Sequence, residues 1–209
     1  MRRNRGPDII GPMRIGPHGS VPFARLRPFM KGTGRPLLAL LLTFATSVFA
    51  QAERAAPSEA SVKAAFLYKF TAYVEWPAKA ARADQPFVVG VMDNDAVAAE
   101  LEALAPGRAI GGRPIAVRRL ARGDPVTGVQ ILFAGGRDPD ATAIRSARKE
   151  GALVVTESEA GLAAGSAINF VVAGDRVGFE VSLDGAERSG VKISSRMLAV
   201  ARRVMQKGS

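Results

Sequence analysis

Cysteine is absent from the 209-residue chain, and its one histidine is His18. His18 precedes an apolar segment that we interpret below as part of an export leader, so the domain that follows contains neither residue. This excludes nucleophilic catalysis by Cys–His or Ser–His–Asp groups and zinc sites built from thiolates or imidazoles. An exported domain without disulfides must be stabilised by the packing of its core alone.

Acidic residues are also scarce, with 19 Asp and Glu against 29 Lys and Arg, which gives a net charge of +10. Eight of the basic residues but only one acidic residue, Asp8, lie within residues 1–50. The rest of the chain therefore carries 21 basic and 18 acidic residues, a net charge of +3. Because the excess positive charge belongs to the first 50 residues, we predict no nucleic-acid partner for the domain.

The first 50 residues have the pattern of a secretory signal. A basic stretch from Arg25 to Arg35 precedes the apolar run 37–50, LLALLLTFATSVFA, and small residues suited to cleavage follow up to Ala52. The apolar run has about 14 residues, whereas a membrane-spanning helix needs about 20. A retained N-terminal anchor is the alternative to cleavage.

We therefore predict a signal peptide over residues 1–52, with translation beginning at Met1 or at Met30. The domain itself would span residues 53–209, reside in the periplasm, and not insert into the membrane after cleavage.

Helix-like and strand-like segments alternate after the leader. Helices are predicted over 58–74, 94–104 and 138–150, with Ser58, Asn94 or Asp95, and Asp138 as N-caps and Gly151 after the third helix. Strands are predicted over 86–92, 113–120, 129–134 and 152–157. This alternation indicates an α/β domain with helices on both faces of the sheet.

The last third of the chain changes character. Strands over 166–172 and 176–183 flank a Gly-containing loop at 173–175, and this hairpin would make the sheet mixed. A short helix from Asp184 to Ser189 is predicted next. A final helix begins at Ser194 or Ser195, with an apolar face made of Met197, Val200, Ala201, Val204 and Met205. The predicted fold is a single α/β domain that ends in a β-hairpin and a helix.

Two motifs have both a chemical and a structural interpretation. Gly135-Gly136 lies between a strand and a helix, where backbone amides can hold a phosphate. No Walker or dinucleotide pattern completes it, so a tight strand-to-helix turn is the favoured interpretation. Glu157 and Glu159 could serve a glycosidase only if they faced each other across a cleft; otherwise they are caps or solvated residues. We predict no enzyme, no cofactor and no metal.

Two single residues have similar alternatives. Trp76, the only tryptophan, precedes Pro77, which ends the predicted helix. Its indole either plugs the core or is exposed for recognition. Glu180 lies in a strand with Val177, Phe179 and Val181 on the opposite face, so it is either solvent-facing or a charged contact on a partner-binding sheet surface.

Three segments together resemble the YfiR-like family of exported bacterial proteins. They are SVKAAFLYKFTAYVEWPA (61–78), GRPIAVRRL (112–120) and INFVVAGDRVGFEVSLDGAERSGVKISSRMLAVARRV (168–204). The resemblance covers nearly the whole chain after the leader. The Glu-Trp-Pro motif and the KISSRML motif are specific when they occur together.

The resemblance implies a periplasmic α/β domain, often a homodimer, that restrains a membrane-bound diguanylate cyclase by binding its periplasmic sensor portion. In this picture the C-terminal hairpin helps to contact the partner, which points to Phe170, Phe179 and Glu180, with Trp76 as a further candidate. The best-known family member contains disulfides that influence the restraint. This chain has no cysteine, so redox control of that type cannot operate here.

The sequence thus favours a non-enzymatic periplasmic regulator that lowers cyclic-di-GMP through protein–protein contact. The alternative is a periplasmic small-ligand-binding module with its pocket at the strand ends near Gly135-Gly136.

Overall fold

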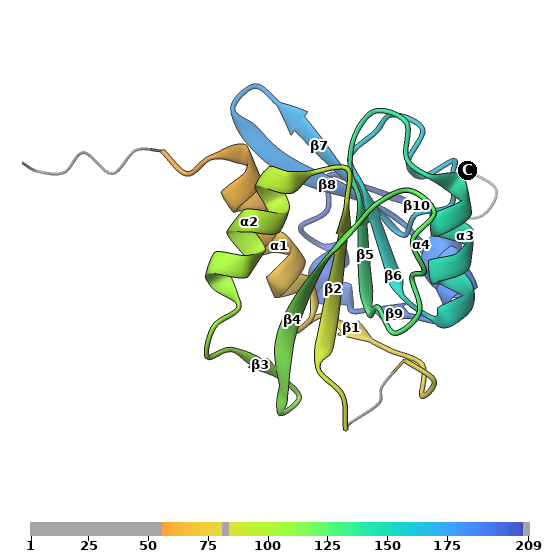
Figure 1. The fold of residues 1–209 in the computed structure, drawn as a ribbon. Coiled ribbons are helices and arrows are strands. Elements are labelled where there is room, and N and C mark those ends of the chain that lie inside the picture. The colour runs from red at the N-terminus through yellow and green to blue at the C-terminus, as the bar shows by residue number, and fades with distance from the viewer. Residues whose placement is uncertain (1–55, 81–83, 207–209) are drawn as a thin grey trace, which may run out of the picture. The chain divides into compact units, whose positions relative to one another are not determined.

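A computed structural model describes residues 56–80 and 84–206, and the predicted leader lies outside these residues. Figure 1 shows an α/β domain in which helices lie on both sides of a twisted sheet. The helices are α1 (Glu59–Phe70), α2 (Asp95–Leu104), α3 (Ala141–Glu150), α4 (Leu183–Ser189) and α5 (Ser195–Leu198). The strands are β1 (Val74–Glu75), β2 (Phe87–Met92), β3 (Ala109–Ile110), β4 (Arg113–Leu120), β5 (Ile131–Ala134), β6 (Leu153–Thr156), β7 (Ile168–Ala173), β8 (Arg176–Ser182), β9 (Lys192–Ile193) and β10 (Arg203–Met205).

The main sheet has the strand order β10-β8-β7-β6-β5-β2-β4-β3. Neighbouring strands from β4 to β7 are parallel, β7 and β8 form an antiparallel hairpin, and β10 is parallel to β8. Strands β1 and β9 form a separate two-stranded antiparallel ladder. The predicted α/β class, with a mixed sheet and helices on both faces, is confirmed.

Strand β5 lies in the middle of the sheet and supplies both halves of the core, because successive side chains of a strand point to opposite faces. Ile131 and Phe133 belong to an apolar cluster with α1 and α2, which we call the α1–α2 cluster. Leu132 and Ala134 belong to a second cluster with α3, which we call the α3 cluster. All four side chains are buried.

Local capping chemistry sets the helix starts. The Ser58 hydroxyl accepts a hydrogen bond from the Ser61 amide at 3.0 Å, and Asn94 Oδ1 accepts one from the Val97 amide at 3.0 Å. Helix α3 is capped by Asp140, two residues later than predicted, and is followed by Gly151 in the left-handed region with φ 84°. The predicted roles of Ser58, Asn94 and Gly151 are confirmed.

The first helix is shorter than predicted. It ends at Phe70, and the chain then turns into β1, where Val74 pairs with Ile193 of β9. The Ser194 amide also donates to the Tyr73 carbonyl at 2.9 Å, which extends this ladder. Pairing with a distant segment therefore replaces the last turn of the helix, and Pro77 follows a strand rather than a helix.

The predicted final helix is wrong beyond Leu198. Helix α5 has four residues, and β10 follows it beside β8, with Arg203 opposite Glu180 in the register. Val200 is 71% exposed and Val204 is 37% exposed, so the helix-like spacing of these residues does not produce a buried face.

None of the helices in the described part of the chain has the length and apolar character that crossing a membrane requires.

Candidate functional site

A polar site lies where the parallel strands end. Strand β2 leads into α2 and then to β4 on one side, whereas β5 lies on its other side, so the winding direction of the sheet changes between β2 and β5. Ligands of open α/β sheets bind at the carboxyl ends of strands beside such a point. Asn94 follows β2, Gly136 follows β5 and Glu157 follows β6, and the structure brings all three into contact.

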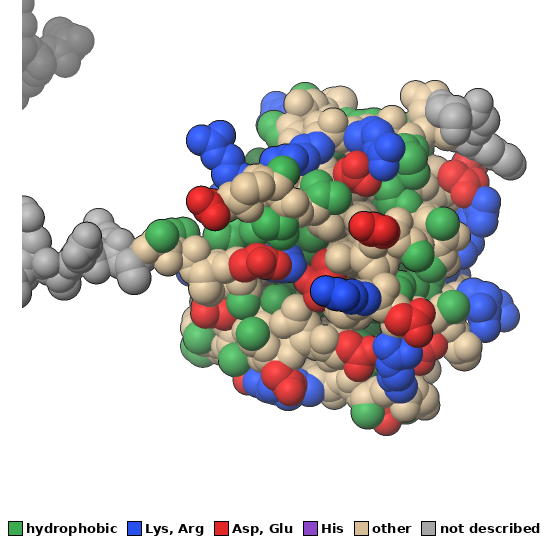
Figure 2. All heavy atoms as spheres, turned by 90° about the horizontal axis from the view of Figure 1, so that it is seen from above, with side chains coloured by type: hydrophobic (Ala, Val, Ile, Leu, Met, Phe, Trp, Pro, Cys, Tyr) green, Lys and Arg blue, Asp and Glu red, His purple; other side chains and the backbone are tan. Residues whose placement is uncertain are grey.

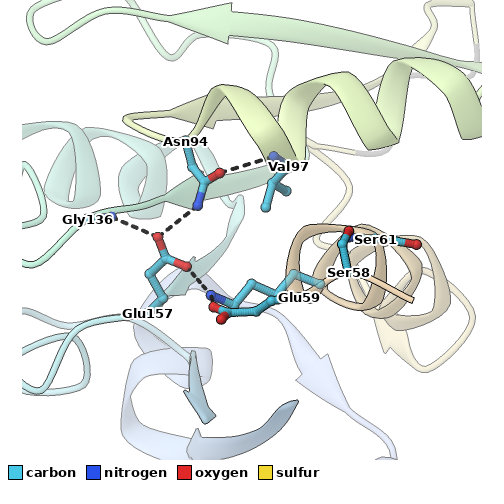
Figure 3. A network of polar contacts seen from close by, with 8 residues as sticks. Ser58, Glu59, Ser61, Asn94, Val97, Gly136 and Glu157 are labelled. Atoms are coloured by element: carbon cyan, nitrogen blue, oxygen red, sulfur yellow. Dashed lines mark hydrogen bonds and ion pairs between the residues drawn. The ribbon is translucent and has the colours of Figure 1, made fainter. Parts of the chain in front are cut away.

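Glu157 is the centre of this site (Figure 3). Its Oε1 accepts hydrogen bonds from Asn94 Nδ2 at 3.0 Å and from the Gly136 amide at 2.9 Å. Its Oε2 accepts from Lys63 Nζ at 2.5 Å. The Glu157 carboxylate, which follows β6, therefore joins α1 to the loops that follow β2 and β5.

Lys63 reaches this carboxylate from the buried side of α1. The side chain is 5% exposed, and its ammonium group bonds both to Glu157 and to Glu59, one turn earlier on the same helix. A buried ammonium group is stable only when it is paired and hydrogen-bonded. The two carboxylates meet this requirement.

Both members of the Lys63–Glu157 pair remain charged. Burial by itself raises the pKa of Glu157, but hydrogen bonds from Lys63, Gly136 and Asn94 and the Lys63 charge outweigh it, so this pKa lies below its ordinary value. Burial by itself lowers the pKa of Lys63, but the hydrogen bonds and charges of Glu157 and Glu59 outweigh it, so this pKa is raised. The site thus holds an ion pair and not a neutral acid or amine.

Glycines allow the loop after β5 to approach this pair. A Cβ atom on Gly135 would lie 2.8 Å from Asn94 Cβ and 3.0 Å from both the Asp93 carbonyl oxygen and Glu157 Oε1. Gly136 has φ +78°, a conformation that favours glycine. The Gly136 amide, which the sequence suggested as a phosphate ligand, instead donates its hydrogen bond to the Glu157 carboxylate.

A cavity of about 530 Å³ opens beside the pair. Its polar lining includes Lys63, Asn94, Glu157, Ser158 and Asn169. Figure 2 views this end of the domain and shows acidic and basic side chains interspersed on the surface, without a field of one sign. The described residues contain no cluster of three or more His, Cys, Asp or Glu side chains suited to hold a metal ion.

Phe170 and Phe179 are partners across the β7–β8 hairpin, and their side chains are 2% and 3% exposed. Their rings pack against Phe66 and Phe70 of α1, with centroid separations of 5.1 to 6.0 Å. The sequence-based expectation of direct partner contact therefore does not fit their position in the described domain. Their aromatic packing holds the hairpin against α1.

Glu180 is not the free surface residue that the strand pattern suggested. Strand β10 covers β8, and Glu180 Oε2 accepts a hydrogen bond from Arg203 Nη2 at 3.0 Å. The Glu180 side chain is 18% exposed, against 59% for Arg203. Its charge is therefore already paired within the domain.

Trp76 lies at the opposite ends of the strands from Glu157. Its Nε1–H donates to the Gln130 carbonyl oxygen at 3.1 Å, just before β5 begins, and its ring meets Phe87 edge-to-face at a centroid distance of 5.1 Å. The side chain is partly buried. The structure therefore separates Trp76 from the hairpin residues with which the resemblance grouped it.

Sequence reasoning predicted Asn94 as a cap and Glu157 as a residue at a strand end, but it missed Lys63. One signal was present, because Lys63 lies three residues before Phe66 and seven before Phe70, on the apolar side of the helix. A lysine in that position needs a buried partner. Nothing in the sequence identifies Glu157, 94 residues away, as that partner.

The fold and this site define a small α/β domain with a charged pair at the point between β2 and β5 where the winding direction of the sheet changes. The chain belongs to the YfiR/HmsC-like family, whose model matches residues 60–202. Members of this family are periplasmic regulators in cyclic-di-GMP signalling, and the family is regulatory rather than catalytic.

Other comparisons add little to this assignment. No curated protein matches the chain. A solved structure described as a conserved domain protein from Vibrio cholerae O1 biovar eltor str. N16961 is similar with a TM-score of 0.48 and 13% identity. The match covers 71% of this chain and 60% of that protein.

Proposed function

We propose that this protein is a non-enzymatic periplasmic regulator that binds the periplasmic sensor portion of a membrane diguanylate cyclase and restrains it, so that cyclic-di-GMP falls. The observation that carries the proposal is the family match, which extends from the start of α1 to the residue before β10. The proposal includes export by a leader over residues 1–52, a domain over 53–209, and a homodimer.

The chemistry of the Glu157 site supports a binding role over a catalytic one. A general acid or base works best with a pKa near the working pH. The pKa of Glu157 is instead held below its ordinary value and that of Lys63 is raised above it. Each oxygen of Glu157 also accepts a hydrogen bond from the protein.

We place the partner contact on the exposed apolar side chains around the hairpin and β10, in place of the buried Phe170 and Phe179. Val172 of β7 is 50% exposed, Val200 before β10 is 71% exposed, and Val204 is 37% exposed. Exposed apolar side chains that gather on one surface can mark a protein interaction site. Val204 also follows Arg203, which lies opposite Glu180 in the register, the charged residue that the resemblance indicated.

The test compares cellular cyclic-di-GMP in wild type, a deletion strain, and deletion strains complemented with Val200→Asp or Ala99→Asp. Val200→Asp adds a charge at the proposed contact, and Ala99→Asp adds the same charge on the exposed side of α2. We expect deletion to raise cyclic-di-GMP, Val200→Asp at normal abundance to behave like deletion, and Ala99→Asp to restore the wild-type level.

Unchanged cyclic-di-GMP on deletion, under conditions where the protein is expressed, would reject the cyclase-restraint proposal. A raised level on deletion together with full function of Val200→Asp would retain the regulator and move the contact surface elsewhere.

A further inference from the structure

The cavity beside Glu157 contains a buried hydroxyl that has no partner. Ser158 is 4% exposed, and its Oγ makes no hydrogen bond within the described residues. Ser158 lines the same cavity as Lys63 and Glu157. Buried polar atoms of folded proteins are nearly always paired, so an orphaned one in the wall of a cavity points to a group that the cavity receives.

Two further donors of this cavity are unused. Asn169 is 4% exposed, and its Oδ1 accepts from the Thr156 hydroxyl at 2.8 Å, but its amide nitrogen donates no hydrogen bond within the described chain. Arg137 lines the cavity from an exposed position in the loop after β5 and makes no ion pair with any described residue. Residues with a hydroxyl, a carboxamide and a guanidinium group therefore line one cavity with donor capacity to spare.

The charged groups deeper in the site do not compete for these donors. Lys63 is engaged by Glu59 and Glu157, and the Glu157 carboxylate also accepts from Asn94 and Gly136. The free donors therefore need an acceptor, and a guanidinium group can pair through two hydrogen bonds with the coplanar oxygens of a carboxylate.

The remaining lining restricts what accompanies that acceptor. Phe170 and Val172 provide a short apolar wall, and the exposed Glu159 adds a negative charge. Glu159 would repel a simple anion and would favour a ligand that also carries a positive or hydrogen-bond-donating group. The volume of about 530 Å³ is suited to a small molecule.

We infer that this cavity binds a small molecule through its carboxylate, which Arg137 holds at the entrance and which Ser158 and Asn169 meet inside. Binding is a property of the domain itself, so the inference goes beyond the proposed function and stands without it. Ligand binding is tested by amide chemical shifts of the purified protein without any partner, whereas the proposed function is tested by cellular cyclic-di-GMP levels. The two proposals can therefore fail independently.

The test uses protein from the full chain, purified from the periplasm and labelled with ¹⁵N. Propionate, 3-aminopropanoate, propylamine and inorganic phosphate are titrated separately, because each probe carries a different part of the expected ligand. We expect the two carboxylates to shift the amides of residues 135–137, 157–159 and 169–172, with 3-aminopropanoate binding more tightly than propionate. Propylamine and phosphate should bind more weakly than either.

Matched variants separate binding from folding. Arg137→Gln should weaken the affinity for 3-aminopropanoate about tenfold, because it removes the charge-assisted pair, while Arg145→Gln on the exposed side of α3 should leave it unchanged. Ser158→Ala should weaken the affinity about fivefold without lowering the melting temperature of the free protein, since the hydroxyl it removes is unpaired.

Three results would overturn the inference. These are no shift of the named amides by any carboxylate at tens of millimolar, binding that is indifferent to both Arg137→Gln and Ser158→Ala, and phosphate binding more tightly than both carboxylates.

Discussion

At the scale of single residues, Lys63 and Glu157 form the interaction with the largest predictable energy. Removing two charges from water is costly, so a complete buried pair adds little net stability, but removing one member leaves an uncompensated buried charge. Lys63 is 5% exposed and Glu157 is 12% exposed at the side chain. The cost of single substitutions should therefore far exceed the cost of the double substitution.

We predict that Lys63→Met lowers the free energy of unfolding by about 3–5 kcal/mol. Lys63→Met combined with Glu157→Gln should recover most of that loss. Urea denaturation gives the values, and Lys69→Met, an exposed lysine on the same helix, should stay within about 0.5 kcal/mol of wild type. A double variant as unstable as Lys63→Met would show that the lysine acts through packing and not through the pair.

The same pair has a defined pH window. Glu157 has a folded-state pKa below its ordinary value of 4.5, so its contribution is present above that pH and is lost as the pH falls below it. Lys63 has a folded-state pKa above 10.5, so its contribution is present below that pH and is lost as the pH rises beyond it. In Lys63→Met, burial without the Lys63 charge raises the pKa of Glu157, so the variant escapes the cost of its unpaired charge by taking up a proton. The stability difference between Lys63→Met and wild type should therefore be largest at neutral to moderately alkaline pH, shrink as the pH falls toward acid, and shrink again as the pH rises beyond 10.5.

At the scale of elements, the sequence predicts those strands and helix caps that depend only on neighbouring residues. Strands 86–92 and 113–120 were predicted within a residue of β2 and β4. The first is a bounded apolar run and the second has a strand-like local pattern, and neither needs a distant partner to be recognised. The caps Ser58 and Asn94 were also predictable, since each bonds to an amide three residues away.

Elements that depend on distant pairing were not predictable. Residues 199–205 have helix-like apolar spacing, yet they end as β10 because the Arg202 amide bonds to the Phe179 carbonyl at 2.8 Å and Arg203 pairs with Glu180. In the site, Asn94 was placed correctly as a cap, but its second bond, to Glu157, spans 63 residues. No periodicity encodes contacts of this range.

Strand β10 has three residues, so we expect its attachment to depend on the Glu180–Arg203 pair. Glu180→Lys and Arg203→Glu would each place like charges opposite one another, and each should lower the free energy of unfolding by about 1 kcal/mol. Each should also speed hydrogen exchange of the amides of residues 203–205. The double variant, which reverses both charges, should restore slow exchange.

A double variant that exchanges as fast as either single variant would indicate that backbone pairing alone holds β10. In either case Glu180→Lys alters the fold locally, so its effect on signalling cannot be assigned to lost partner contact without this control.

At the scale of the whole molecule, the core is continuous across the sheet and no disulfide reinforces it. The α1–α2 cluster and the α3 cluster meet at β5, where Phe133 and Leu132 are adjacent in the chain, point to opposite faces, and are both fully buried. If either cluster loses its packing, β5 becomes exposed on that side, although its other side is still needed by the opposite cluster. The described domain should therefore unfold as one unit.

The single tryptophan makes this testable, because Trp76 packs against the α1–α2 cluster and lies on the far side of the sheet from α3. Ile144→Val removes one methylene group from the α3 cluster and should cost about 1 kcal/mol. If the domain is cooperative, this variant shifts the urea midpoint of Trp76 fluorescence as far as the midpoint of far-ultraviolet circular dichroism. Phe133→Leu, on the other face, should move both midpoints together in the same way, while the exposed Ala99→Ser should move neither. A circular dichroism transition that shifts in Ile144→Val while the Trp76 transition stays in place would mean that the two faces unfold separately, with β5 remaining packed against α1 and α2 after α3 is lost.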